Sequence, residues 1–181
     1  MLPYMKKLMI PFIAGYDEAG FWKLKRKCQD ANNIILKTYY LRRYNKLSLK
    51  FGAYVGYNAQ IVDIPTLPHS LFGIFISDLS AIGRNCVIFH HVTIGSNTLQ
   101  DSKGQGAPII GDNCYIGVGA KIIGNIRIGN NVRIGANCVV TQDIPDDHTV
   151  VLPLPRLIAR NNMNNSFVRM KRADSGELEV K

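Results

Sequence analysis

An aliphatic residue recurs at every sixth position through the middle of the chain, and no other sequence feature constrains the fold as strongly. The repeat occupies Val55, Ile61 and Leu67, then Ile76, Ile82, Ile88 and Ile94, then Ile110, Ile116, Ile122, Ile128, Ile134 and Val140. Six residues do not match a helical period, but they suit a short strand followed by a turn. Three such units make a triangular coil of about 18 residues, and successive coils pair as parallel strands. We therefore expect a mainly β fold, a parallel β-helix with these aliphatic side chains inside.

Small residues occupy the other fixed positions of the repeat. Glycine follows the aliphatic residue in many units, and we expect glycine or asparagine to turn the corners, where a positive φ is often needed. Cys86, Cys114 and Cys138 each lie four positions after a repeat aliphatic residue. The fourth cysteine is Cys28, and the four have no close spacing. This pattern predicts small buried thiols and neither a disulfide framework nor a metal site.

Two insertions interrupt the repeat. Three extra residues lie between Leu67 and Ile76, and ten extra residues lie between Ile94 and Ile110. The second insertion contains SNTLQDSKGQGAP, which has the composition of a loop. A coil cannot accommodate ten extra residues internally, so residues 96–108 are predicted to project outward, where loops commonly carry function.

The net charge of +9 sits at the two ends of the chain. Residues 1–50 carry eleven Lys and Arg against three Asp and Glu, whereas residues 51–155 carry five against seven. We divide the chain into a basic helical N-terminal region (1–52), a β-helix domain (53–155) and a C-terminal tail (156–181). The basic region has no zinc-finger spacing or aromatic-rich binding signature, so we expect no nucleic-acid partner. The basic face is either only solvated or in peripheral contact with anionic lipid, and the sequence does not decide between the two. The predicted location is cytoplasmic, with the inner face of the membrane as an alternative.

Two of the four histidines fall into the same phase of the repeat. His69 and His90 each lie two positions after a repeat aliphatic residue, and one coil plus the three-residue insertion separates them. If the insertion bulges outward, both stack on one face, in a column that continues through Val118 and Ala136. His91 should then point inward, because side chains alternate along a strand. A neutral imidazole in this column suits a general base.

The segment IGDNCYIGVGAKIIGNIRIGNNVRIGANCVVTQDIP resembles the hexapeptide-repeat acyltransferases. Within them it is similar to the serine acetyltransferase group, and nearest to the capsule and exopolysaccharide O-acetyltransferases of that group. The resemblance implies a left-handed β-helix, a homotrimer, and acetyl-CoA bound between neighbouring β-helices as the donor to a hydroxyl. It places His69 at the catalytic position, with His90 as the second catalytic candidate. Acetyl-CoA is expected to contact Ser96, Gly117, Val118, Ala136 and Arg156, with no metal required.

Two departures from the serine-specific members direct the prediction of the acceptor. Tyr54 stands where those enzymes carry an aspartate, and Gly106 and Ala107 stand where they carry a basic pair before the loop proline. A serine carboxylate then has no obvious partner. We therefore predict acetyl transfer to a hydroxyl of a saccharide in surface polysaccharide biosynthesis. Serine O-acetyltransferase activity in cysteine biosynthesis and a non-catalytic β-helix scaffold are the alternatives, whereas a γ-carbonic-anhydrase-like zinc site lacks its H-x4-H pair.

Overall fold

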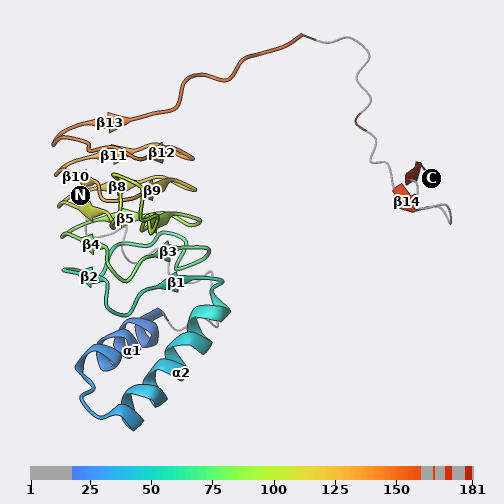
Figure 1. Ribbon diagram of the computed structural model, residues 1–181. Coiled ribbons are helices and arrows are strands. Elements are labelled where there is room, and N and C mark those ends of the chain that lie inside the picture. The colour runs from blue at the N-terminus through green and yellow to red at the C-terminus, as the bar shows by residue number, and fades with distance from the viewer. Residues whose placement is uncertain (1–17, 160–164, 166–169, 173–177, 181) are drawn as a thin grey trace.

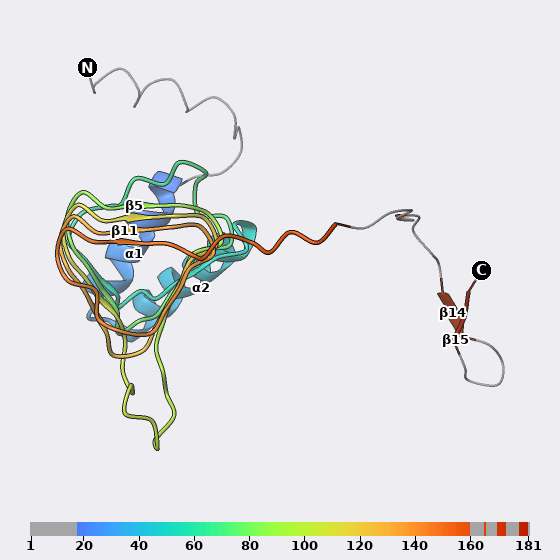
Figure 2. The ribbon, with the colours of Figure 1, turned by 90° about the horizontal axis from the view of Figure 1, so that it is seen from above.

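A computed structural model describes residues 18–159, 165, 170–172 and 178–180 of the chain. Residues 1–17 of the predicted N-terminal region and most of the predicted tail lie outside the described residues. The described chain begins with two helices, continues as a stack of triangular coils, and leaves the stack after the last coil (Figure 1). Seen along the stack, the coils superpose as a triangle (Figure 2).

Three parallel sheets form the sides of the triangle, and each coil contributes strands to them in turn. The first sheet contains β1 (Tyr54–Val55), β3 (Phe75–Ile76), β6 (Thr93–Gly95), β9 (Lys121–Ile123) and β12 (Val139–Val140). The second contains β2 (Gln60–Ile61), β4 (Ala81–Ile82), β7 (Ile109–Ile110) and β10 (Arg127–Ile128). The third contains β5 (Val87–Ile88), β8 (Tyr115–Ile116), β11 (Arg133–Ile134) and β13 (Thr149–Val150). Beyond the stack, β14 (Met170–Arg172) and β15 (Leu178–Val180) pair antiparallel. The predicted left-handed parallel β-helix is thereby confirmed.

The repeat aliphatic residues fill the inside of the coils. Eleven of the thirteen are at most 2% exposed, and Val55, Ile88, Ile94, Ile116 and Ile122 are completely buried. Ile61 and Leu67 are only partly buried, because they lie in the first coil, where β2 forms the edge of its sheet. Each Å² of buried apolar surface contributes about 25 cal/mol to stability. This continuous column is therefore the main source of stability.

The repeat glycines have a different role from the one expected. None of the glycines that follow a repeat aliphatic residue has a positive φ; the corners are turned instead by asparagines such as Asn85, Asn113 and Asn131, with φ between 51° and 57°. A Cβ on Gly117 would lie 2.8 Å from the backbone nitrogen of Ala136. The prediction that these glycines supply positive φ is therefore wrong: they let adjacent coils approach closely.

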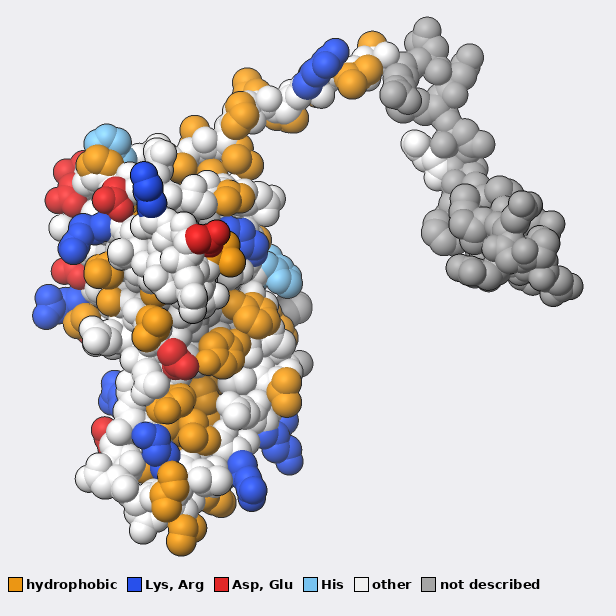
Figure 3. All heavy atoms as spheres, in the orientation of Figure 1, with side chains coloured by type: hydrophobic (Ala, Val, Ile, Leu, Met, Phe, Trp, Pro, Cys, Tyr) orange, Lys and Arg blue, Asp and Glu red, His pale blue; other side chains and the backbone are white. Residues whose placement is uncertain are grey.

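Helices α1 (Glu18–Asp30) and α2 (Ile34–Lys50) close the lower end of the β-helix (Figure 1). The Asn33 side chain caps α2, and Phe21 packs with Tyr44 and Phe51 in a buried cluster that continues the core. Neither helix is long and apolar enough to cross a membrane, among the residues described. On the face shown in Figure 3, Lys and Arg side chains are scattered over the helices and coils rather than gathered in one patch. The predicted contact with anionic lipid stays a prediction.

Residues 96–108 connect β6 to β7 and extend away from the triangle (Figure 2). At the base of this loop, Asn97 and Gly106 exchange backbone hydrogen bonds of 2.8 and 3.0 Å. The Asn97 side chain also donates to the Ser102 hydroxyl at 2.7 Å. The ten-residue insertion is thus a folded hairpin at one corner of the β-helix.

Candidate active site

The three-residue insertion forms the turn that carries His69. Thr66 pairs with Val87, 21 positions later, whereas the Phe72 carbonyl accepts a hydrogen bond from the backbone N–H of His91, 19 positions later. One coil higher, the N–H of Gly119 donates to the His90 carbonyl in the same way. Phe72 and His90 therefore occupy the same position in successive coils, with Phe72 below. The extra residues therefore bulge between Thr66 and Phe72. Ser70 takes a φ of 56° within the bulge, and the exposed His69 side chain lies just before it.

The bulge brings His69 beside His90. Their ring centroids are 4.7 Å apart with the rings nearly perpendicular, and the His69 ring also lies 5.8 Å from that of Phe89. Phe89 in turn lies 5.1 Å from Tyr115. Two imidazoles are therefore held together at the corner between the third and the first sheet, against an aromatic wall.

His90 is the more enclosed of the two imidazoles. Its Nδ1 is buried and has no hydrogen-bond partner among the described residues. Burial lowers the pKa of His90 below its usual 6.5, and the nearby rings of His69 and His91 lower it further. His90 is consequently a neutral imidazole at physiological pH, with the polar edge at Nδ1 unpaired.

His91 does not point into the core. It is exposed, takes a φ of 60°, and its ring packs against Gly73 so closely that no Cβ would fit there. The prediction that His91 faces inward is wrong because strict alternation applies to extended strands, and His91 lies in the turn that follows β5.

The column above His90 is formed by small and apolar residues. Gly119 N–H donates to the His90 carbonyl at 3.1 Å and Asn137 N–H donates to the Val118 carbonyl at 2.8 Å, so His90, Val118 and Ala136 stack in successive coils. Val118 is half-buried, Ala136 is exposed, and the buried Gly117 lies beside Val118. The structure thus places these predicted acetyl-CoA contacts next to the histidine pair.

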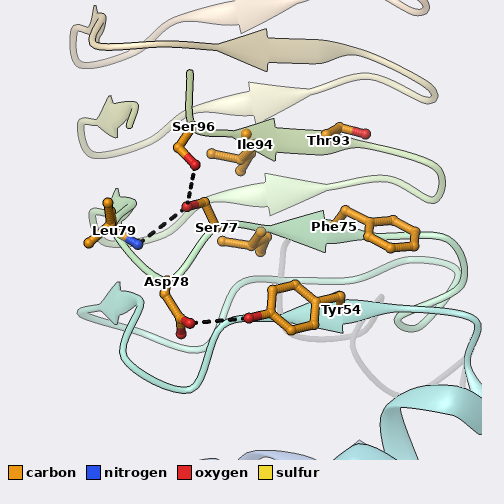
Figure 4. A pocket seen from close by; sticks show the side chains of 10 residues that line it. Tyr54, Phe75, Ser77, Asp78, Leu79, Thr93, Ile94 and Ser96 are labelled. Carbon is orange, nitrogen blue, oxygen red and sulfur yellow. Dashed lines mark hydrogen bonds between the residues drawn. The ribbon is translucent and has the colours of Figure 1, made fainter. Parts of the chain in front are cut away.

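Ser96 lies in a separate groove of about 440 Å³ on the outer face of the first sheet (Figure 4). Its hydroxyl lies 3.2 Å from that of Ser77, and Phe75 forms part of the wall. At the lower end, the Tyr54 hydroxyl donates to Asp78 at 3.1 Å. Burial raises the pKa of Tyr54, and the Asp78 carboxylate raises it further. Tyr54 is therefore engaged with a carboxylate of its own chain.

Arg156 lies on the exposed segment after β13 that runs away from the coils, so the structure does not bring it beside the other predicted residues (Figure 2). Groups of three or more metal-binding side chains are absent from the described parts of the chain.

Sequence reasoning missed Lys121. This half-buried side chain begins β9 on the first sheet, and its Nζ donates to the His91 carbonyl at 2.6 Å. The signal in the sequence was its position three residues after Val118, one coil above the His90 turn. Lys121 therefore places an ammonium group at the histidine corner.

Comparisons with known proteins agree with this architecture. The bacterial transferase hexapeptide pattern of six repeats matches residues 107–142. A serine acetyltransferase from Synechococcus elongatus is 42% identical over 91 residues, which cover 50% of this chain and 36% of the relative. One from Staphylococcus epidermidis is 47% identical over 79 residues, covering 44% and 36%. The chain thus spans little more than a third of the length of these relatives.

Solved structures show the same similarity. Serine acetyltransferase isoform 3 from Entamoeba histolytica, in complex with cysteine, has a TM-score of 0.67 at 27% identity over 88% of this chain and 57% of its own. The Neisseria gonorrhoeae serine acetyltransferase in complex with serine has a TM-score of 0.60 at 33% identity, over 74% and 52%. The resemblance to the serine acetyltransferase group is confirmed.

These relatives correct the predicted acceptor. The prediction of a saccharide in polysaccharide biosynthesis is contradicted, because the similar proteins are named serine acetyltransferases and one of the similar structures holds serine. The nearer resemblance to capsule and exopolysaccharide O-acetyltransferases stays a prediction. The replacement of a basic pair by Gly106 and Ala107 therefore does not identify the acceptor.

Proposed function

We propose that this protein is a serine O-acetyltransferase that uses acetyl-CoA as the donor. The observation that carries the proposal is the pair of adjacent imidazoles, His69 and His90, on a β-helix similar to those of serine acetyltransferases. Histidine is the side chain whose ordinary pKa suits proton transfer near neutral pH. The histidine pair supplies a base, and the neighbouring column of small residues leaves room for an extended thioester.

His69 acts as the general base. The serine hydroxyl attacks the thioester carbonyl, and an imidazole nitrogen of His69 takes the hydroxyl proton as the C–O bond forms. Collapse of the tetrahedral intermediate breaks the C–S bond, and the proton passes to the departing thiolate. No covalent enzyme intermediate is needed. His90 lies against the base, and because its lowered pKa keeps it uncharged, it does not repel the imidazolium that forms on His69.

Acetyl-CoA lies along the column above the histidines. Val118 and Ala136 offer an apolar track one and two coils above His90, with strands about 4.8 Å apart. Gly117 stays a proposed contact beside Val118, where the missing Cβ lets the next coil approach closely. Ser96 and Arg156 stay proposed contacts from more distant positions, Ser96 from a different part of the surface and Arg156 from the segment after β13.

The enzyme is proposed to act as a homotrimer. The first sheet presents exposed apolar side chains outward, with Tyr54 45%, Phe75 47% and Val139 65% exposed. A groove open on one side gains depth and loses water when a neighbouring copy covers it. Symmetric association is the usual way in which soluble chains cover such surfaces.

Thiol release tests the proposed function. The purified chain is incubated with acetyl-CoA and L-serine, and free thiol is followed while O-acetylserine is identified by mass. L-alanine, which lacks only the hydroxyl, is the matched control. We expect release with L-serine and none above background with L-alanine. Binding of CoA without release with L-serine would contradict the proposal, and absence of CoA binding would favour a structural role for the β-helix.

A further inference from the structure

Lys121 is a cation without an acidic partner at the histidine corner. Its Nζ donates to the His91 carbonyl at 2.6 Å, and within the described residues it forms no ion pair. An ammonium group has three donors, so two remain available after this bond. The side chain is half-buried and therefore partly shielded from bulk water.

Three histidine rings lie at the same corner. The rings of His69 and His90 are 4.7 Å apart and those of His90 and His91 are 5.3 Å apart. No Asp or Glu side chain hydrogen-bonds to these rings or to Lys121 in the described part of the chain. A corner with an ammonium, three imidazoles and no paired carboxylate is suited to an anionic group.

We propose that Lys121 binds the carboxylate of the acceptor amino acid. The assignment rests on the proposed function, and it supplies the partner that Gly106 and Ala107 cannot provide. The carboxylate carbon and the hydroxyl oxygen of serine are three bonds apart. In the proposed pose the carboxylate lies on Nζ and the hydroxyl points toward the histidine pair. The bond to the His91 carbonyl holds the ammonium at the same turn that carries His90. Lys121 therefore determines that the acceptor is an amino acid with a free carboxylate.

Comparison of L-serine with L-serinamide tests this role. The amide keeps the hydroxyl and the amino group but removes the negative charge. In Lys121→Met we expect kcat/KM for L-serine to fall about 10-fold or more, through KM, because a hydrogen bond to a charged group is lost. The value for L-serinamide should change by less than about twofold. Lys23→Met, which removes an exposed charge from α1, is the matched control and should leave both values unchanged.

Three results would overturn the assignment. An equal loss with both acceptors would mean that Lys121 only positions the His91 turn. A weaker affinity for CoA in Lys121→Met, measured by titration calorimetry without acceptor, would assign the ammonium to the donor instead. Absence of transfer to L-serine by the wild-type protein overturns the proposed function as well, whereas the first two results leave it intact. Thermal unfolding of each variant shows that the fold is retained.

Discussion

Replacing Lys25 by methionine should change how the stability of the protein depends on pH. Lys25 lies on α1 at the closed end of the β-helix and is only 4% exposed. Its Nζ donates to the carbonyl oxygens of Ala59 at 2.7 Å and Tyr57 at 3.2 Å. Burial lowers the pKa of this amine from 10.5 to about 8, and the carboxylate of Asp78 offsets a part of the effect. The folded protein thus holds this proton less tightly than the unfolded chain does.

The sign and size of the effect follow from the two pKa values. Between pH 8 and 10.5 the unfolded state binds more protons than the folded state, so the stability rises with pH. Below pH 8 both states are protonated and the cost of burying the charge is present in full. A difference of about 2.5 pKa units corresponds to about 3 kcal/mol. Methionine has a similar length and no charge, so its contribution is independent of pH.

Urea unfolding at several pH values measures the difference directly. We expect the unfolding free energy of the wild type, minus that of Lys25→Met, to increase by about 2 to 3 kcal/mol from pH 7.5 to 10.5. Groups that titrate equally in both proteins cancel in this difference. Lys23→Met, at an exposed position of the same helix, should give a flat difference. A flat difference for Lys25→Met would show that the amine titrates alike in the folded and unfolded states, and that burial does not lower its pKa.

Two further substitutions test the coils and the loop. Gly117→Ala should lower the unfolding free energy in urea by about 1–3 kcal/mol, because its Cβ would lie 2.8 Å from the backbone nitrogen of Ala136. Gly104→Ala is the control: the nearest atom to its Cβ lies 3.8 Å away, so the unfolding free energy should hardly change. Ser102→Ala removes the acceptor of the Asn97 side chain in the hairpin, so limited proteolysis within residues 96–108 should become several-fold faster while global unfolding is unchanged. Equal cleavage rates would show that this bond does not hold the loop.

The repeat made the β-helix predictable because apolar residues fill most inward positions of a coil. Ile88 and Ile116 stack directly in β5 and β8, as the six-residue period requires. The position of the bulge was also predictable, since three extra residues had to leave the coil somewhere between Leu67 and Ile76. The role of the glycines was not predictable from the sequence. Close approach between coils depends on residues of the next coil, such as Ala136, that are distant in the local sequence.

The candidate site was predictable only where it follows the phase of the repeat. Counting placed Val118 and Ala136 above His90, as the structure does, but Phe72 and not His69 lies below His90. His69 reaches the His90 ring, 4.7 Å away, from the bulge. His91 departed from the expectation because its left-handed backbone redirects the side chain at the corner. Lys121 was missed because its contact with the His91 carbonyl joins residues 30 positions apart through a flexible side chain. The acceptor was predicted wrongly because it was argued from Tyr54, Gly106 and Ala107 alone, whereas the similar proteins are named serine acetyltransferases.

We propose that His69 removes the proton of the acceptor hydroxyl. The most direct measurement is kcat for thiol release from acetyl-CoA with L-serine, in His69→Ala and in His148→Ala, whose exposed histidine lies before β13. We predict that His69→Ala lowers kcat by about 10²- to 10⁴-fold, with unchanged affinity for CoA, whereas His148→Ala keeps the wild-type rate. A wild-type rate in a folded His69→Ala variant would contradict the account.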